Sequence, residues 1–227
     1  MRLFHRRRRA DPSSVAWGDL RRLRPISSNW GFDRGSPVDR HYIETFLEEH
    51  RGDVRGACLE LLNAGYTQRF GGERVTSAGV LDIDPGNRAA TVTGDLTRSG
   101  TLAAGTIDCF ILTQTLQHVY DVRAALANAY AALKPGGVLL ITVPAMIKVH
   151  REPEDYWRFT ADALRRLIRD TMPGVACDVR TYGNLPAGIA FLMGLAAQEL
   201  TPQELEAHDP EHPLIVAARA AKPPMTA

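Results

Sequence analysis

The chain has 227 residues, with 27 Lys and Arg against 26 Asp and Glu, and 44% of its residues are hydrophobic. This length suits one sizeable α/β domain whose core is large enough to be stable alone. The balanced charge gives no overall field that would attract nucleic acid, so we expect no nucleic-acid partner. No apolar run is long enough for a signal peptide or a membrane span, so we expect no membrane partner either.

The cysteines indicate the redox environment. Cys58, Cys109 and Cys177 are odd in number and lie in apolar, strand-like stretches. Their spacing is not that of a metal site, and buried reduced thiols are typical of cytosolic proteins. The sequence therefore predicts a cytoplasmic protein with no metal ion.

The first 35 residues form a basic entry segment with the run Arg6-Arg7-Arg8-Arg9. A solvated, flexible leader is favoured over a binding arm for this run. Trp17 and Trp30 are costly to leave in water, so we expect the segment from Trp17 onward to pack on the domain, with a lid as one interpretation. The α/β domain then takes residues 36–227.

In chain order, the first expected element of the domain is a helix at Ser36-Pro37-Val38-Asp39, with Ser36 as its cap and Pro37 in its first turn. Strands and helices then alternate. The expected strands are 57–62, 74–81, 107–113, 138–143, 175–181 and 214–218, and the expected helices are 121–133, 161–169 and 188–200. This alternation predicts an α/β fold, a doubly wound, mostly parallel sheet with helices on both faces.

The turn after the first strand is unusual for a nucleotide-binding sheet. Such a turn normally carries glycines, because the absence of a Cβ lets the backbone approach a ligand closely. Here the strand ends at Glu60, Leu62 and Ala64 occupy the turn, and only Gly65 remains nearby. The pattern favours the fold more strongly than it favours a bound cofactor.

Three segments resemble one family. Residues 107–121 (IDCFILTQTLQHVYD) resemble a fourth strand and its loop, residues 133–140 (LKPGGVLL) resemble a helix-to-strand turn, and residues 155–160 (DYWRFT) resemble a substrate-side signature. Together they are similar to the class I S-adenosylmethionine-dependent methyltransferases of the small-molecule type, over residues 37–218. The resemblance implies a Rossmann-like fold and S-adenosylmethionine as cofactor.

The resemblance also implies cofactor contacts at the strand ends. Glu60, Asn63 and Gly65 in the first turn would lie against the methionine part and ribose, and Asp95 and Leu96, after a short third strand, would flank the adenine. Thr113 and Gln114, after the fourth strand, would make further cofactor contacts. The sequence departs from the family pattern at two positions of this cofactor site. Leu62 takes the place of a glycine, and the acid expected at the end of the second strand falls near Ala78-Gly79, so that Asp82 or Asp84 substitutes only if the register shifts.

Three residues are candidates for catalysis. His150 and His118 follow strand ends, and histidine is the side chain whose intrinsic pKa lies near neutral pH, which suits a general base. We prefer His150, which precedes the Tyr156 signature, and a structural role for His118 is the alternative. Tyr156 is expected to orient the acceptor, although simple packing of Tyr156 and Trp157 is an equally good interpretation.

The preferred function is methyl transfer from S-adenosylmethionine to a small molecule, a sugar or secondary metabolite, with oxygen as the favoured acceptor atom. A second hypothesis is a cofactor-independent cyclase or rearrangement enzyme on the same scaffold. A third is a non-catalytic, methyltransferase-like partner protein, which predicts a filled pocket and a large exposed apolar patch. The sequence does not define the acceptor, the pathway or the oligomeric state.

Overall fold

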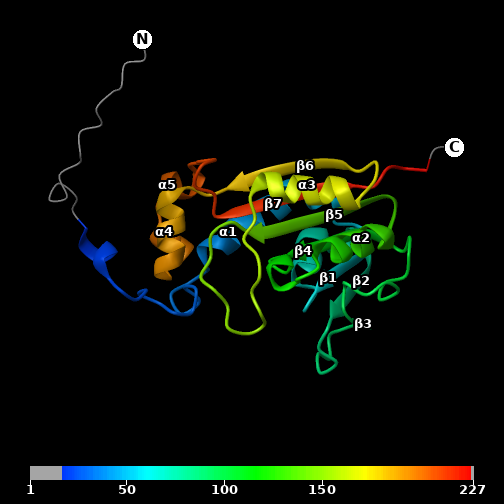
Figure 1. The fold of residues 1–227 in the computed structure, drawn as a ribbon, viewed down its shortest axis with the longest axis horizontal. Coiled ribbons are helices and arrows are strands. Elements are labelled where there is room, and N and C mark those ends of the chain that lie inside the picture. Colours follow the sequence, from blue (N-terminus) through cyan, green and yellow to red (C-terminus); the bar gives the residue numbers. More distant parts are fainter. Residues whose placement is uncertain (1–16, 226–227) are drawn as a thin grey trace, which may run out of the picture.

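A seven-stranded sheet in the order β3-β2-β1-β4-β5-β7-β6 organises the chain (Figure 1). The structure is a computed structural model, and it describes residues 17–225, so the run Arg6–Arg9 lies outside the described residues. The strands are β1 Gly56–Leu61, β2 Val75–Asp82, β3 Val92–Thr93, β4 Ile107–Thr113, β5 Leu133–Pro144, β6 Ala176–Tyr182 and β7 Ile215–Ala221. Strands β1 to β5 pair in parallel, and β7 runs antiparallel to both β5 and β6. The expected mostly parallel sheet is confirmed.

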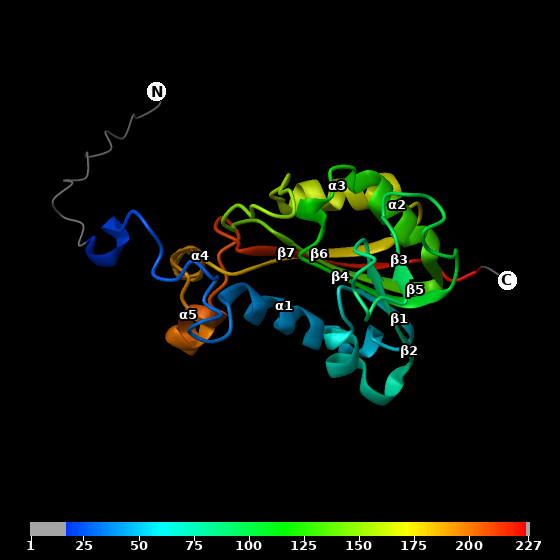
Figure 2. The same cartoon turned by 90° about the horizontal axis from the view of Figure 1, so that it is seen from below.

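Helices cover both faces of the sheet, as Figure 2 shows. They are α1 Val38–Glu49, α2 Val122–Ala132, α3 Ala161–Thr171, α4 Leu185–Met193 and α5 Pro202–Glu206. Helices α2 and α3 lie on one face, and α1, α4 and α5 lie on the other (Figure 2). The sheet therefore separates two hydrophobic clusters, which together form the core.

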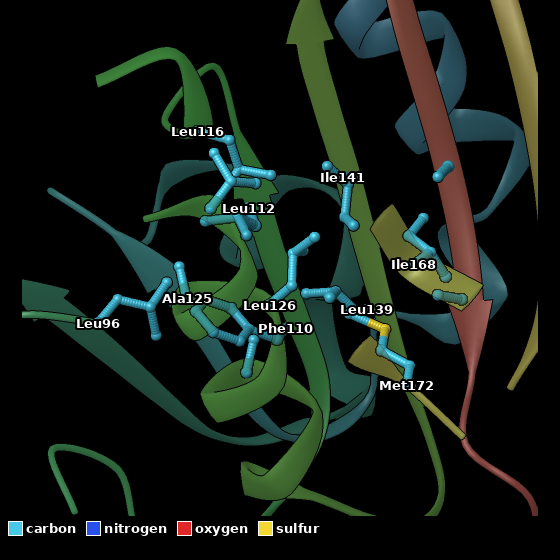
Figure 3. Close-up of a cluster of buried hydrophobic side chains, with 14 of the residues drawn as sticks. Leu96, Phe110, Leu112, Leu116, Ala125, Leu126, Leu139, Ile141, Ile168 and Met172 are labelled. Atoms are coloured by element: carbon cyan, nitrogen blue, oxygen red, sulfur yellow. The ribbon is translucent and has the colours of Figure 1, made fainter. Parts of the chain in front are cut away.

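The cluster under α2 and α3 shows why the sequence folds this way (Figure 3). Helix α2 buries Ala125 and Leu126 at helical spacing against Phe110 of β4 and Leu139 of β5. The central strands are continuous apolar runs because both of their faces are covered. The expected cap Thr160 begins α3, accepting a hydrogen bond from the Ala163 N–H at 3.2 Å.

Several boundaries differ from expectation for identifiable reasons. The expected helix 188–200 is instead α4, which ends at Met193 because Gly194 adopts a φ of +74°. Helix α1 begins at Val38 with Pro37 as its N-cap, and Ser36 does not cap it. In the described part of the chain, the connection from β1 to β2 contains only short helical turns at Thr67–Gly71 and Gly72–Arg74.

The second half of the entry segment is fixed to the domain. The Ile26 N–H donates to the Met193 carbonyl at 2.8 Å, and the Ala197 N–H donates to the Ser36 carbonyl at 2.7 Å. Arg34 also forms an ion pair with Glu199. Residues 26–36 therefore lie against α4 and the turn that follows it, whereas Trp17 remains 42% exposed.

Gly194→Ala should loosen this attachment. A Cβ at Gly194 would strike the Ser27 carbonyl, and its positive φ disfavours any side chain. Gly100→Ala is the matched control, because Gly100 has a φ of +86° with nothing within 4 Å of the added Cβ. We expect Gly194→Ala to lower the free energy of unfolding by at least about 1 kcal/mol more than the control. Limited proteolysis of residues 26–36 should also accelerate, and equal effects of the two variants would contradict this account.

Candidate functional site

A cavity of about 510 Å³ opens at the carboxyl ends of β1 and β4. Ligands of parallel α/β sheets bind at this edge, because the loops that follow the strands converge there. The wall combines the turn after β1, the loop after β4, helix α1, the entry segment and the loop after β5. The lining residues used below are Trp30, Asp39, Arg40, Glu44, Glu60, Leu62, Asn63, Gly65, Thr113, Gln114, Gln117, His118 and His150.

Glu60 fixes the turn after β1. Its buried carboxylate accepts hydrogen bonds from the backbone N–H groups of Thr67 at 2.8 Å and Tyr66 at 3.2 Å. Burial raises the pKa of Glu60 above its usual range. Asn63 closes the turn through its Oδ1, which accepts from the Gly65 N–H at 2.9 Å. The turn is thus held by a carboxylate and an amide instead of by close glycine packing.

Leu62 adopts the backbone conformation of the missing glycine. Its φ is +66°, a region that costs a branched L-residue about 1–2 kcal/mol. Its side chain is 64% exposed and lines the cavity. The backbone path of a glycine turn is therefore kept, with a leucine side chain added at the cavity wall.

The end of β2 corrects one expectation. The register pairs Leu61 with Leu81, so Asp82 is the last residue of β2, and the expectation that Ala78-Gly79 stands there is wrong. No shift of register is needed to place an acid at this end. The Asp82 carboxylate accepts from Asn87 Nδ2 at 2.6 Å, and the same amide donates to the Leu62 carbonyl at 2.8 Å. Asn87 thereby ties the end of β2 to the turn after β1.

Asp95 and Leu96 are not among the residues that line the cavity. The Asp95 carboxylate accepts from the Thr97 N–H at 2.8 Å, which shapes its own loop. Leu96 is 5% exposed and packs in the core cluster with α2. Their contact with adenine stays a prediction.

The loop after β4 lines the cavity and contains two acceptors that are buried without a partner among the described residues. Gln114 has a φ of +46° and is held by its N–H, which donates to the Thr142 carbonyl at 2.8 Å. Gln117 Nε2 donates to the Gln114 carbonyl at 2.8 Å, which fixes the orientation of that amide. In the described structure, Gln114 Oε1 and Gln117 Oε1 are buried without a partner. A buried acceptor without a partner is costly, so this wall suits a ligand that carries hydrogen-bond donors.

His118 and His150 meet inside the cavity, with ring centroids 4.8 Å apart in an edge-to-face arrangement. His118 Nδ1 lies 2.8 Å from the Glu154 carbonyl, which can only accept, so Nδ1 carries the proton. His150 Nδ1 lies 3.4 Å from Asp155 Oδ2. In each neutral ring, Nε2 is then the basic nitrogen.

Asp155 orients His150 and is itself held by Arg158. The guanidinium contacts both carboxylate oxygens, at 2.5 and 2.8 Å, and this hydrogen bonding holds the pKa of Asp155 well below its usual range. Burial lowers the pKa of His150, so that ring is neutral near pH 7. A neutral imidazole backed by a carboxylate is the arrangement of a general base.

The entry segment covers this pair. The Trp30 ring stacks on the His150 ring at 5.0 Å, and Lys148 Nζ lies 3.4 Å from the Trp30 centroid. Within residues 17–225, the buried Trp30 Nε1 has no partner. Trp30 therefore forms part of the cavity wall.

Tyr156 lies outside the cavity lining. Its ring is 45% exposed and packs edge-to-face on Tyr120 at 5.3 Å. Its N–H donates to the Gln117 carbonyl at 2.7 Å, so its backbone supports the loop that carries Gln117. The structure does not bring its hydroxyl to His150, and its role toward an acceptor stays a prediction.

Helix α1 supplies residues that the sequence did not identify. Asp39, Arg40 and Glu44 line the cavity, and Glu44 also forms an ion pair with Arg69 at 2.7 Å. Burial raises the pKa of Asp39 to about 6. The available signal was the position of Asp39 in the first turn of a helix that follows the entry segment.

The described residues contain no metal cluster and no spanning helix. No group of three or more His, Cys, Asp or Glu in residues 17–225 could hold a metal ion. In the same range, no helix combines the length and the hydropathy needed to cross a bilayer. Cys58 and Cys109 are buried free thiols, and Cys177 is half-buried.

Asp39→Asn should change the pH dependence of stability. Because the folded protein binds this proton more tightly than the unfolded chain, the native protein loses stability as pH rises from about 4 through about 6. The variant lacks that loss, so the melting temperature of Asp39→Asn minus that of the native chain should be more positive at pH 7.5 than at pH 4. Asp162→Asn, at an exposed carboxylate of α3, is the control. The same pH trend in both variants would rule out burial of Asp39 as its cause.

Comparisons with known proteins agree with this architecture. A protein-family model described as "Methyltransferase domain" matches residues 66–141, beginning just after the Leu62 turn. The ubiquinone/menaquinone biosynthesis C-methyltransferase UbiE of Marinomonas sp. (strain MWYL1) is 29% identical over 113 residues. That match covers 38% of this chain and 45% of the relative, so the chain spans less than half the length of this relative.

Two solved structures show the same fold. The S-adenosylmethionine dependent methyltransferase of Mesorhizobium loti superposes with a TM-score of 0.56 at 16% identity, over 85% of this chain and all of its own. The [4+2]-cyclase SpnF superposes with a TM-score of 0.57 at 14% identity, over 89% of this chain and 88% of its own. Residues 66–141 of the chain therefore match a methyltransferase domain, and the chain has the fold of these solved structures.

Proposed function

We propose that this protein transfers the methyl group of S-adenosylmethionine to a hydroxyl of a small molecule. The observation that carries the proposal is the single cavity that joins the turn after β1 to the pair His118 and His150. Methyl transfer needs a nucleophile placed in line with an activated methyl group, with water excluded. One continuous cavity with a base at one end and strand-end turns at the other meets that requirement.

The residues at the strand ends fit the cofactor. S-adenosylmethionine supplies a methyl group already activated on a sulfonium sulfur. The turn held by Glu60 would receive its methionine part, and Asp82, which ends β2 but does not line the cavity, is the nearest strand-end acid for its ribose. The unpartnered acceptors Gln114 Oε1 and Gln117 Oε1 suit its ammonium group or an acceptor hydroxyl. Leu62 is the one side chain at this wall that narrows the fit.

The base favours oxygen as the acceptor atom. His150 Nε2 would take the proton of the hydroxyl as its oxygen forms the new bond to carbon, and Asp155 would stabilise the imidazolium. The relative UbiE is named as a C-methyltransferase, and carbon is therefore the runner-up acceptor atom.

A cofactor-independent cyclase is the second candidate function, and Leu62 is the observation that favours it. A leucine in the glycine position reduces the space for a nucleotide cofactor, while the cavity and its histidines remain. A similar scaffold is found in the [4+2]-cyclase SpnF. Loss of all affinity for the cofactor would favour this candidate.

Calorimetric titration with S-adenosylhomocysteine separates the two candidates. We expect the native protein to bind it, and Leu62→Gly to bind it about fivefold more tightly, the equivalent of about 1 kcal/mol. Leu62→Asn is the control, because asparagine tolerates a positive φ but keeps a side chain at the wall. If Asn and Gly tighten binding equally, backbone strain and not steric filling is the cause. No binding to any of the three proteins would rule out methyl transfer.

Replacing the histidines side by side tests the base. With an acceptor found by screening hydroxylated compounds for release of S-adenosylhomocysteine, His150→Ala should lower kcat about a hundredfold or more, and His118→Ala should lower it much less. Asp155→Asn should move the acid limb of the kcat profile to lower pH, because Asp155 raises the pKa of His150. A larger effect at His118 would reverse the assignment, and no effect at either would mean that placement alone drives the reaction.

A further inference from the structure

An exposed apolar strip lies on the entry segment, away from the cavity. It consists of Trp17, Leu20, Leu23 and Ile26, which are 42%, 48%, 101% and 37% exposed. These residues recur every third position, and the chain between them begins with the 3₁₀ turn Gly18–Arg21. Only Leu20 of the four lies within that turn, and the backbone is extended at Arg22 directly after it, so the strip follows an irregular stretch of backbone. Four exposed apolar side chains in ten residues are more than scattered surface positions explain.

Positive charge accompanies this strip. Arg21, Arg22 and Arg24 alternate with the apolar residues and are all exposed. Residues 1–16 add five arginines and one aspartate in sequence. The chain as a whole is nearly neutral, so the rest of the protein is net negative and the basic charge is concentrated at this end.

The apolar surface continues onto α4. The Ile26 N–H bonds the Met193 carbonyl, which seats the strip beside that helix (Figure 2). Helix α4 leaves Leu185 and Leu192 exposed by 45% and 44%. A groove of about 420 Å³ is lined by Leu20 and Ile26 from the strip and by Ile189 and Met193 of α4, with Asp19, Glu199 and Glu204 also in its wall. The strip and the α4 residues along this groove thus form one face.

We propose that this face docks on the surface of an anionic lipid bilayer. Peripheral membrane segments combine Trp and Leu, which enter the headgroup region, with Lys and Arg, which meet lipid phosphates. Each arginine held near an anionic membrane surface strengthens binding about fivefold. Such docking would place the protein on the membrane surface without crossing the bilayer.

The same observations argue against other partners. A second copy of the chain would bring two arginine clusters together, and like charges oppose that association. Single-stranded nucleic acid would use the arginines and Trp17, but aliphatic Leu20, Leu23 and Ile26 offer no stacking surface for bases. A negatively charged surface with an apolar layer beneath it uses both kinds of side chain.

Vesicle cosedimentation of the full chain tests the proposal. The probes are vesicles of phosphatidylcholine alone and of phosphatidylcholine mixed with phosphatidylglycerol, each at low and at high salt. Two variants remove the two halves of the face: R21A/R22A/R24A and L20S/L23S. The matched controls are R55A/R88A/R98A and I83S/M225S, at exposed arginines and exposed apolar residues elsewhere. Circular dichroism melts confirm that each variant is folded. The comparison of the two vesicle types at the two salt concentrations uses the native chain alone, so it does not depend on any variant folding.

We expect the native chain to bind the anionic vesicles, weakly at high salt, and not the neutral ones. Loss of three arginines should weaken binding about a hundredfold. L20S/L23S should also weaken it, and the two controls should not. Failure to bind anionic vesicles, equal binding to neutral vesicles, or equal losses in the controls would overturn the proposal. Tight binding of a mixed-sequence RNA without vesicle binding would overturn it in favour of nucleic acid.

Discussion

The parallel pairing of β1 with its two neighbours is the constraint on which the site depends. Glu60 pairs with Ile111 of β4, and Leu61 pairs with Leu81 of β2, so the three strands end at the same edge. This register brings Glu60, Asp82 and Thr113 to one edge of the sheet from positions far apart in sequence. The apolar composition of these strands fixes the register, because a slip would expose the core faces of buried strands.

Because this edge is set by the sheet, the turn after β1 can diverge in sequence while its path persists. Leu62 holds the positive φ of the usual glycine, and Asn87 bonds both its carbonyl and Asp82. The Glu60 carboxylate accepts hydrogen bonds from the Thr67 and Tyr66 N–H groups. Hydrogen bonds from the surrounding structure therefore maintain a conformation that the local sequence disfavours, as is common at binding sites.

The sequence predicted the elements with long, regular patterns and missed those that depend on tertiary contacts. The apolar runs of β1, β4 and β5 and the stripe of α2 gave correct elements, because burial on both sides of a sheet leaves a clear signature. The length of α4 was overestimated, since its apolar residues continue past Gly194 although its backbone does not. At the candidate site, strand-end positions brought His118, His150, Glu60 and Thr113 into the cavity wall. Asp39 was missed because only the packing of α1 over the strand ends brings it there.

The contact of Trp30 with His150 joins the entry segment to the loop after β5 that carries the proposed base. Residues 26–36 are fastened at both ends, by the Ile26 bond to Met193 and by the Ser36 bond to Ala197. The span between them must therefore cross the cavity wall, where Trp30 takes a φ of +53° and stacks on His150. That stack removes water from one face of the imidazole, and burial is the main cause of its lowered pKa. Asp155, itself held by Arg158, lies 3.4 Å from Nδ1 of the same ring. The neutral, oriented imidazole of His150, the proposed base, thus depends on how the entry segment is attached to α4, so residues outside the sheet contribute to the proposed site.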